Sequence, residues 1–191
     1  MAFFAATLAS CQQVGHLRDG DIIFHRSTSR QAVAIAAATR SDYTHVGLIF
    51  FDSGKPFVYE AVQPVKRTPL KEWIERGERQ HFVVKRLNDG RQVNAAALKH
   101  EVQNMLGKGY DWLFEWSDSK IYCSELVWKA YQRSHGIEIG RLRSLRDFNL
   151  ISPVVLHQMQ ERYGKMIPWE MSVIAPSDIF DSPLLCDVPN Q

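Results

Sequence analysis

Two apolar stretches of strand length, joined by a short polar segment, constrain the fold of this chain more than any other feature. The first stretch is His45-Val46-Gly47-Leu48-Ile49-Phe50-Phe51, and the second is Phe57-Val58-Tyr59-Glu60-Ala61-Val62. β-Branched and aromatic residues in runs of this length favour strands, and Asp52-Ser53-Gly54-Lys55-Pro56 between them is typical of a turn. The sequence therefore predicts a β-hairpin over residues 45–62.

Glu60 is unusual within this hairpin because its neighbours on the same face, Val58 and Val62, are apolar. A carboxylate among such residues is costly unless it is paired, although an edge-strand glutamate facing water is an equal alternative. His45 lies on the same face as Glu60, and next to it, if the numbers of paired residues add to an odd value. An even sum places the two side chains on opposite faces. The turn permits either register.

The remaining pattern predicts an α+β domain with a mainly antiparallel sheet. Thr68-Pro69 resembles an N-cap followed by proline, which predicts a short helix from Leu70. The other expected elements are strands at 21–25, 82–87 and 173–175 and helices at 31–39, 92–106, 123–134 and 153–163.

The composition excludes several classes of protein. With 191 residues the chain is long enough for one core, and its net charge of +2 gives no reason to expect a nucleic-acid partner. Three cysteines allow at most one disulfide, Cys11–Cys186, which would join the two chain ends. The cysteines and the seven histidines show no zinc-site spacing, so we expect no metal and no other cofactor.

The N-terminal segment differs from the rest of the chain. Residues 1–17 are expected to form a separate arm preceding a domain at 18–191. Leu8-Ala9-Ser10-Cys11 resembles a lipoprotein processing site, but no Lys or Arg precedes it. The segment is thus either a truncated export signal, which would place the protein in the cell envelope or periplasm, or an apolar arm of a cytoplasmic protein.

Cys123 is the first candidate for chemistry because it stands at the start of the helix predicted over 123–134. The helix dipole and the unpaired backbone N–H groups there favour thiolate, the nucleophilic form, and the same N–H groups can hold an oxyanion. The alternative is a buried structural cysteine, since free cysteines are among the most buried residues.

Four motifs in chain order resemble the circularly permuted, NlpC-type branch of the papain-like cysteine hydrolases. They are Gly20-Asp21-Ile22-Ile23-Phe24, Asp42-Tyr43-Thr44-His45-Val46-Gly47, Tyr59-Glu60-Ala61-Val62 and Tyr122-Cys123-Ser124-Glu125-Leu126-Val127. The similarity runs from about residue 18 to about residue 185 and includes Arg162-Tyr163-Gly164-Lys165. The order His45, Glu60, Cys123 is that of the permuted branch, whereas papain has its cysteine first.

The resemblance implies a papain-like fold, with an antiparallel sheet or small barrel packed against helices. It also implies a triad in which Cys123 attacks an amide or ester, His45 is the base and Glu60 orients His45, with a thioester acyl-enzyme as intermediate. Tyr43, Tyr122 and Ser124 are the candidates for substrate or oxyanion contacts. The alternatives are a hydrolase or transferase acting on acyl lipids, and a lipid- or peptide-binding module with a vestigial triad.

The expected partner is a small peptide, amide or acyl-lipid substrate, near a membrane or cell wall. The aromatic loop Asp111-Trp112-Leu113-Phe114-Glu115-Trp116 could line an apolar pocket, although such aromatics more often belong to a core. Arg141, Arg143 and Arg146 could meet an anionic polymer or headgroup, although a solvated face is the more common role. The sequence does not predict the oligomeric state.

Overall fold

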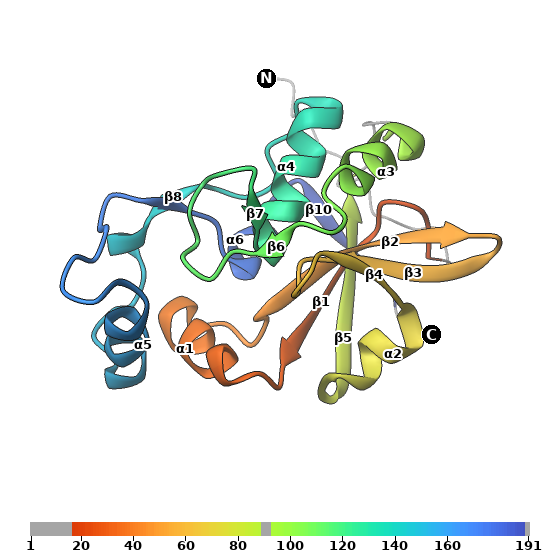
Figure 1. The fold of residues 1–191 in the computed structure, drawn as a ribbon. Helices are drawn as coiled ribbons and strands as arrows, with labels where there is room; N and C mark the ends of the chain where they lie inside the picture. The colour runs from red at the N-terminus through yellow and green to blue at the C-terminus, as the bar shows by residue number, and fades with distance from the viewer. Residues whose placement is uncertain (1–16, 89–92, 190–191) are drawn as a thin grey trace, which may run out of the picture.

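The computed structural model describes residues 17–88 and 93–189, and its centre is one six-stranded antiparallel sheet (Figure 1). The strand order is β10-β5-β1-β2-β3-β4. These strands span Leu185–Val188, Gly77–Leu87, Ile22–Ser27, His45–Asp52, Lys55–Glu60 and Lys66–Pro69, respectively. Within the described residues the sheet is open, with β10 and β4 at its edges, so the barrel alternative is wrong and the open sheet is correct.

Six helices and two small strand pairs complete the fold over the described residues. The helices are α1 (Arg30–Thr39), α2 (Leu70–Glu75), α3 (Ala95–Gln103), α4 (Cys123–His135), α5 (Pro153–Tyr163) and α6 (Pro176–Phe180), with a 3-10 turn at Leu145–Asp147. The strand pairs are β6 (Gly109–Tyr110) with β7 (Lys120–Ile121), which is parallel, and β8 (Arg143–Ser144) with β9 (Ser172–Val173).

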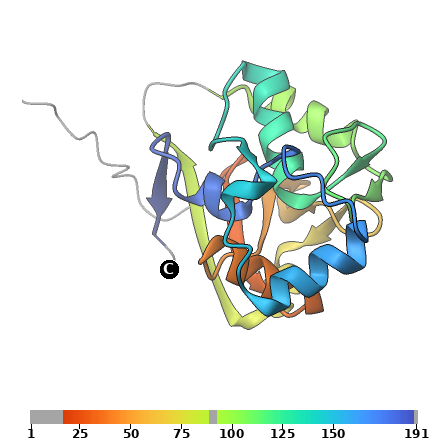
Figure 2. The ribbon, with the colours of Figure 1, turned by 90° about the vertical axis from the view of Figure 1, so that its left-hand side faces the viewer.

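The sheet has an apolar core on each face because its strands alternate their side chains. Ile22 and Phe24 of β1 belong to the large core that includes residues of α3 and α4, whereas Ile23 points to the other face. On that second face Trp73 of α2 packs with Ile23, Ile49, Val58, Val84 and Val188. Helices therefore cover both faces, and α1 and α5 pack together beyond one end of the sheet (Figures 1 and 2).

The predicted hairpin forms with the odd-sum register: Leu48 lies opposite Tyr59 and Asp52 opposite Lys55. The turn therefore contains only Ser53 and Gly54, both with positive φ (50° and 77°). Positive φ at both central residues is the requirement of a two-residue type I′ turn, whose twist matches the flanking strands. This turn fixes which residues of the two strands share a face.

The helices over 123–134 and 153–163 are confirmed as α4 and α5, and the short helix begins at Leu70 as predicted, whereas one helix start and one predicted N-cap differ. The helix expected over 92–106 begins at Ala95, because Asn94 is its N-cap and accepts a hydrogen bond from the Ala97 N–H at 3.1 Å. Residue 92 lies outside the described residues. Thr68 is not an N-cap: it lies in β4, and its hydroxyl donates to Glu60.

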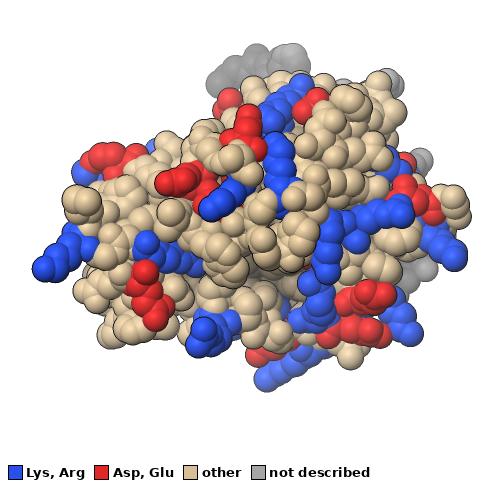
Figure 3. Space-filling model, viewed as in Figure 1, with Lys and Arg blue, Asp and Glu red and all other residues tan. Residues whose placement is uncertain are grey.

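Charged side chains are mixed over the surface. Figure 3 shows Lys and Arg interspersed with Asp and Glu on the face seen in Figure 1. Of the predicted arginine cluster, Arg143 pairs with Asp178 at 3.0 Å and Arg146 with Glu170. None of the helices in the described parts of the chain has the length and apolar character needed to cross a bilayer. The predicted arm, apart from Leu17, and Cys11 lie outside the described residues.

Candidate active site

The candidate site lies where the ends of two strands and the start of one helix come together. His45 is the first residue of β2, Glu60 is the last residue of β3, and Cys123 is the first residue of α4. The hairpin register places His45 and Glu60 on the same face as diagonal neighbours. The structure thus brings together three residues that are separated by up to 78 positions in the sequence, as the difference between 45 and 123 shows.

His45 and Glu60 form a short hydrogen bond. His45 Nε2 lies 2.6 Å from Glu60 Oε2, and both side chains are nearly or fully buried. The imidazole also hydrogen-bonds the side chain of Cys123. Because Nε2 is used by Glu60, Nδ1 is the ring nitrogen left for Cys123. The imidazole therefore bridges the thiol and the carboxylate.

Glu60 accepts three further hydrogen bonds from residues that follow it in the chain. Thr68 Oγ1 donates to Oε1 at 2.6 Å, Trp73 Nε1 donates to Oε2 at 3.0 Å, and Arg76 Nη2 donates to Oε1. A buried carboxylate needs such donors because it has lost its contact with water. The segment β4–α2 therefore holds Glu60 in one orientation and keeps it charged.

The pKa values of the pair follow from these contacts. Burial opposes charge on His45, but hydrogen bonds to Cys123 and Glu60 outweigh it and raise the pKa of His45 to about 10. Burial likewise opposes charge on Glu60, but the hydrogen bond and charge of His45, with Thr68 and Arg76, lower the pKa of Glu60 to about 2. Imidazolium and carboxylate are thus the forms favoured at neutral pH.

Cys123 is a free thiol, 4% exposed, at the N-terminus of a thirteen-residue helix. The Tyr122 N–H donates to Glu125 Oε2 at 3.2 Å, which closes the first turn of α4 around the cysteine. The backbone N–H groups of Cys123 and Ser124 belong to this first turn, where helical geometry supplies no acceptor. They are thus suited to hold negative charge that develops on a substrate oxygen.

Two ring side chains, His25 and Trp73, support the imidazole of His45. His25 of β1 pairs with His45 across the strands, with ring centroids 5.3 Å apart. Trp73 stacks on His25 at 3.8 Å and on His45 at 5.9 Å. The same indole donates to Glu60, so Trp73 contacts both the histidine and the carboxylate that orients it.

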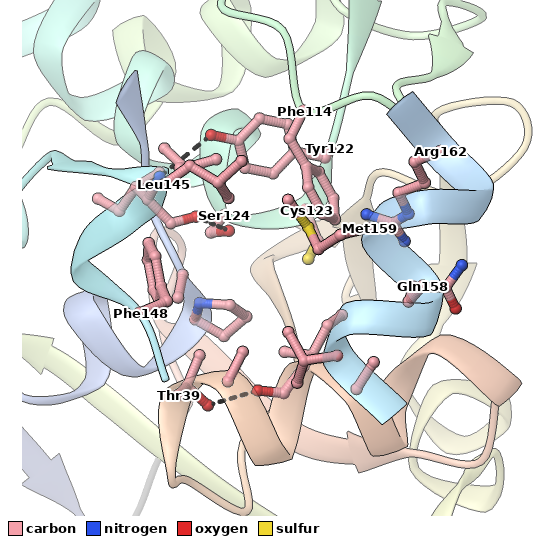
Figure 4. Close-up of a pocket in the computed structure, with 18 of the residues that line it drawn as sticks. Thr39, Phe114, Tyr122, Cys123, Ser124, Leu145, Phe148, Gln158, Met159 and Arg162 are labelled. Atoms are coloured by element: carbon pink, nitrogen blue, oxygen red, sulfur yellow. Dashed lines mark hydrogen bonds between the residues drawn. The ribbon is translucent and has the colours of Figure 1, made fainter. Parts of the chain in front are cut away.

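A largely apolar pocket opens onto Cys123. Its empty volume is about 690 Å³, including the solvent-filled space at its open mouth. The pocket lies between α1, α5, the start of α4 and the segments 145–150 and 173–176. Figure 4 shows the Cys123 sulfur within it, with Leu145 and Phe148 on one side and Arg162 on the other. Phe114 of the predicted aromatic loop also lines this pocket, whereas Trp116 packs on Trp128 and Trp112 is exposed.

The three candidates for oxyanion or substrate contact lie in different surroundings. Ser124 lines the pocket, but its hydroxyl donates to the Ile174 carbonyl at 2.7 Å. The Tyr122 hydroxyl accepts from the Ile174 N–H at 3.2 Å, and burial raises the pKa of Tyr122. Tyr43 stacks on Phe180 at 4.1 Å, outside the pocket lining. The side chains of Ser124 and Tyr122 therefore tie the start of α4 to segment 173–176.

Sequence reasoning missed five residues that surround the triad: His25, Thr68, Trp73, Arg76 and Arg162. Thr68, Trp73 and Arg76 reach Glu60 from β4, α2 and its C-cap. A buried glutamate does indicate that donors exist, but their spacing of 8, 13 and 16 residues from Glu60 follows no local periodicity. Arg162 appeared only as part of a motif.

Comparisons with known proteins identify the family of this chain. Residues 16–188 match the model of a family described as "Permuted papain-like amidase enzyme, YaeF/YiiX, C92 family". The chain is 46% identical over 173 residues to "Uncharacterized protein YiiX" of Escherichia coli strain K12, which covers 90% of this chain and 86% of that protein. The expected resemblance to the permuted papain-like branch is confirmed.

A crystal structure of YiiX from Escherichia coli O157:H7 has a similar fold. It matches with a TM-score of 0.88 and 46% identity, over 91% of this chain and 97% of that one. That protein is described as a metalloprotein. In the described parts of the present chain no group of three or more His, Cys, Asp or Glu side chains is arranged to hold a metal ion, so no metal ligand set is assigned.

Proposed function

Because the chain belongs to the permuted papain-like amidase family, we propose that it is a cysteine hydrolase that cleaves an amide or ester bond. Cys123 is the nucleophile, His45 is the general acid and base, and Glu60 orients His45. The contact of His45 with both partners, Cys123 on one side and Glu60 Oε2 at 2.6 Å on the other, carries this proposal.

The reaction begins with attack of the Cys123 sulfur on the substrate carbonyl. The first-turn N–H groups of α4 stabilise the negative oxygen that forms. His45 then gives its proton to the leaving amine or alcohol, and the bond to that group breaks, leaving a thioester on Cys123. Water attacks the thioester while His45 takes a proton from that water, which releases the acid and restores the Cys123 thiolate beside the His45 imidazolium. Glu60 stabilises the imidazolium throughout.

The lining of the pocket favours a substrate with an apolar acyl group. The side chains around Cys123 are mainly aliphatic and aromatic, and they come from α1, α5 and segment 145–150. Such a surface gains free energy by removing an acyl chain from water. We propose acyl amides or acyl esters, lipids included, ahead of purely polar cell-wall peptides.

The test is a screen of amide and ester libraries against the wild type, Cys123→Ala and Cys123→Ser. We expect turnover by the wild type only, with both variants folded. His45→Ala is matched by His157→Ala, which removes an imidazole that is mostly exposed on α5. Turnover that persists in Cys123→Ala contradicts the mechanism. No turnover of any substrate, together with slow labelling of Cys123 by iodoacetamide, supports a vestigial triad in a binding module instead.

A further inference from the structure

Arg162 of α5 stands out in the pocket because it is a cation among apolar side chains. Within the part of the chain that the structure describes, it is the one Lys, Arg, Asp or Glu residue in the pocket lining. Figure 4 shows it extending from α5 into the pocket that also contains the Cys123 sulfur. A charge in such a place loses hydration and is costly unless something offsets it.

The neighbours of Arg162 hold the guanidinium in place without neutralising it. One N–H of Nη2 donates to Gln31 Oε1 at 2.8 Å, and Gln31 Nε2 donates in turn to the Tyr110 hydroxyl at 3.2 Å. The guanidinium carbon lies 4.3 Å from the centre of the Phe114 ring. All three partners are uncharged side chains, so they orient the arginine and leave its charge in place.

Within the described ranges 17–88 and 93–189, no carboxylate forms an ion pair with Arg162. This differs from Arg76, Arg143 and Arg146, each of which has a Glu or Asp partner. A guanidinium has five N–H donors, and among the described residues one hydrogen bond to the protein, to Gln31, uses them. The remaining donors are therefore available to a ligand.

Tyr110 links the arginine to the nucleophile electrostatically. Burial raises the pKa of Tyr110 most, and the charge of Cys123 raises it further, whereas the charge of Arg162 lowers it. Tyr110, Cys123 and Arg162 line the same pocket, and Gln31 connects Tyr110 to Arg162 by hydrogen bonds. A ligand group that bonds Arg162 would lie in the same part of the pocket as the Cys123 thiol.

We infer that Arg162 selects substrates that carry an anionic oxygen group, a carboxylate or a phosphate, next to the bond that Cys123 attacks. The planar guanidinium matches both groups through two parallel N–H···O bonds. The apolar side of the pocket takes the acyl chain and Arg162 takes the anion. The inference rests on the proposed function and narrows its substrate class to anionic acyl amides or esters.

A pair of thiol reagents tests this without a substrate. Iodoacetate and iodoacetamide both alkylate the thiolate and release iodide, but only iodoacetate carries a carboxylate. The ratio of their rate constants at Cys123 cancels any change in the amount or reactivity of the thiolate. We expect Arg162→Gln to lower the iodoacetate/iodoacetamide ratio about tenfold, which corresponds to ~1.4 kcal/mol. Arg162→Lys should retain most of the ratio.

Lys165→Gln is the matched control, because it removes one positive charge from an exposed position three residues further along the chain. It should leave the ratio within about twofold of wild type, since exposed charges are screened by solvent and salt. Equal ratios in the wild type, Arg162→Gln and Lys165→Gln overturn the inference. Absolute rates report separately on the proposed function: a thiol that reacts slowly with both reagents is not activated, whatever the ratio.

Protection of wild-type Cys123 from iodoacetamide gives a second measurement that needs no variant. N-octanoylglycine is compared with N-octanoylglycinamide, and N-octanoyl phosphoethanolamine with N-octanoylethanolamine. The inference is supported if at least one anion gives half-protection at a concentration about tenfold below that of its neutral partner. The two pairs distinguish carboxylate from phosphate. Equal protection within both pairs overturns it.

Discussion

His25 and His45 lie directly opposite each other on β1 and β2, and their pKa values move in opposite directions. Burial and then the nearby charge of His45 lower the pKa of His25 to about 3. His25 Nδ1 has no hydrogen-bond partner within the described structure, whereas His45 contacts both Cys123 and Glu60. The site therefore keeps a single imidazolium at neutral pH, next to the Cys123 side chain.

The first prediction concerns alkylation of Cys123 as a function of pH. Because the pKa of His45 is raised to about 10, its positive charge persists through neutral pH and is lost as the pH rises through that value. A neighbouring cation favours thiolate, so alkylation of Cys123 by iodoacetamide should be fast at neutral pH and should depend on His45. The measurement is the rate constant for alkylation of Cys123 from about pH 5 to about pH 10, in steps of roughly half a pH unit.

Two variants and one control test this prediction by comparing their pH profiles with that of the wild type. His45→Ala should move the profile to higher pH, and Glu60→Gln should move it less, because Glu60 acts on the thiol only through His45. His157→Ala should leave the profile in place. A wild-type profile that titrates like a free thiol and does not respond to His45→Ala would mean that the two side chains are uncoupled.

The second prediction is that Glu60 makes the fold sensitive to acid. Its pKa is lowered to about 2 in the folded protein, from the ordinary value of 4.5 for a glutamate side chain. Ionised Glu60 therefore stabilises the fold above pH ~4.5, and this contribution is lost as the pH falls through ~2. The shift corresponds to a contribution on the order of 3 kcal/mol.

Urea unfolding at a series of pH values from about 6 down to about 2.5 measures this contribution. The free energy of unfolding of the wild type should fall steeply in that range, and that of Glu60→Gln should be lower at pH 6 and fall less. Glu72→Gln, which changes an exposed carboxylate on α2, should retain the wild-type slope. Equal slopes for the wild type and Glu60→Gln would show that Glu60 is not held as a carboxylate.

The third prediction separates two tryptophans. Trp73 Nε1 donates to Glu60 Oε2, whereas Trp128 Nε1 is buried with no hydrogen-bond partner among the described residues. Trp73→Phe removes a hydrogen bond to a charged group and should cost about 2 kcal/mol of stability. Trp128→Phe removes an N–H that makes no such bond and should cost less. Thermal unfolding measures both, and a greater loss for Trp128→Phe would contradict the assigned contact.

If the proposed function is correct, Trp73→Phe should also lower kcat by a larger factor than it changes KM. The indole helps fix the carboxylate that orients His45, and this orientation matters most in the transition state. Activity that remains at the wild-type level would mean that Thr68 and Arg76 are sufficient to hold Glu60.

The sequence predicted the hairpin and the main helices, because each depends on local pattern, and its motifs named His45, Glu60 and Cys123, which the structure places at three neighbouring element ends. The segment 52–56 permits either hairpin register, so the odd-sum register is predicted only from the expected pairing of His45 with Glu60, and the structure confirms that register. The two-residue turn at Ser53-Gly54 decides the register, and Ser53 with a positive φ is not a strong sequence signal for it.

The surroundings of Glu60 and Cys123 could not be predicted in the same way. Thr68 has a local sequence context that suggests a helix cap, but the buried carboxylate of Glu60 attracts its hydroxyl across the strands instead. Arg162 and Phe114 come together only after α5 and the loop before β7 have packed. Such contacts depend on tertiary packing, which a single sequence does not encode in any periodic pattern.

The last prediction concerns Gly47, which lies in β2 two residues after His45 and packs closely against β3, the strand that carries Glu60. A Cβ at this position would overlap the side chain of Val58 and lie 2.9 Å from the Tyr59 carbonyl oxygen and 3.5 Å from Glu60 Cβ. The backbone of β3 cannot move away from this Cβ without also moving Glu60 away from His45. We therefore expect Gly47→Ala to cost about 2 kcal/mol of stability or more and to reduce the reactivity of Cys123 at neutral pH.

Gly109→Ala is the matched control, because a Cβ there would have its nearest neighbour, a Lys120 side-chain atom, at 3.7 Å, an ordinary contact distance. It should leave both the melting temperature and the alkylation rate close to wild type. The two measurements together identify the cause. A loss of stability in Gly47→Ala with an unchanged alkylation rate would show that the strands separate without disturbing the His45–Glu60 pair, and that the reactivity of Cys123 does not depend on the close approach of β2 and β3 at this glycine.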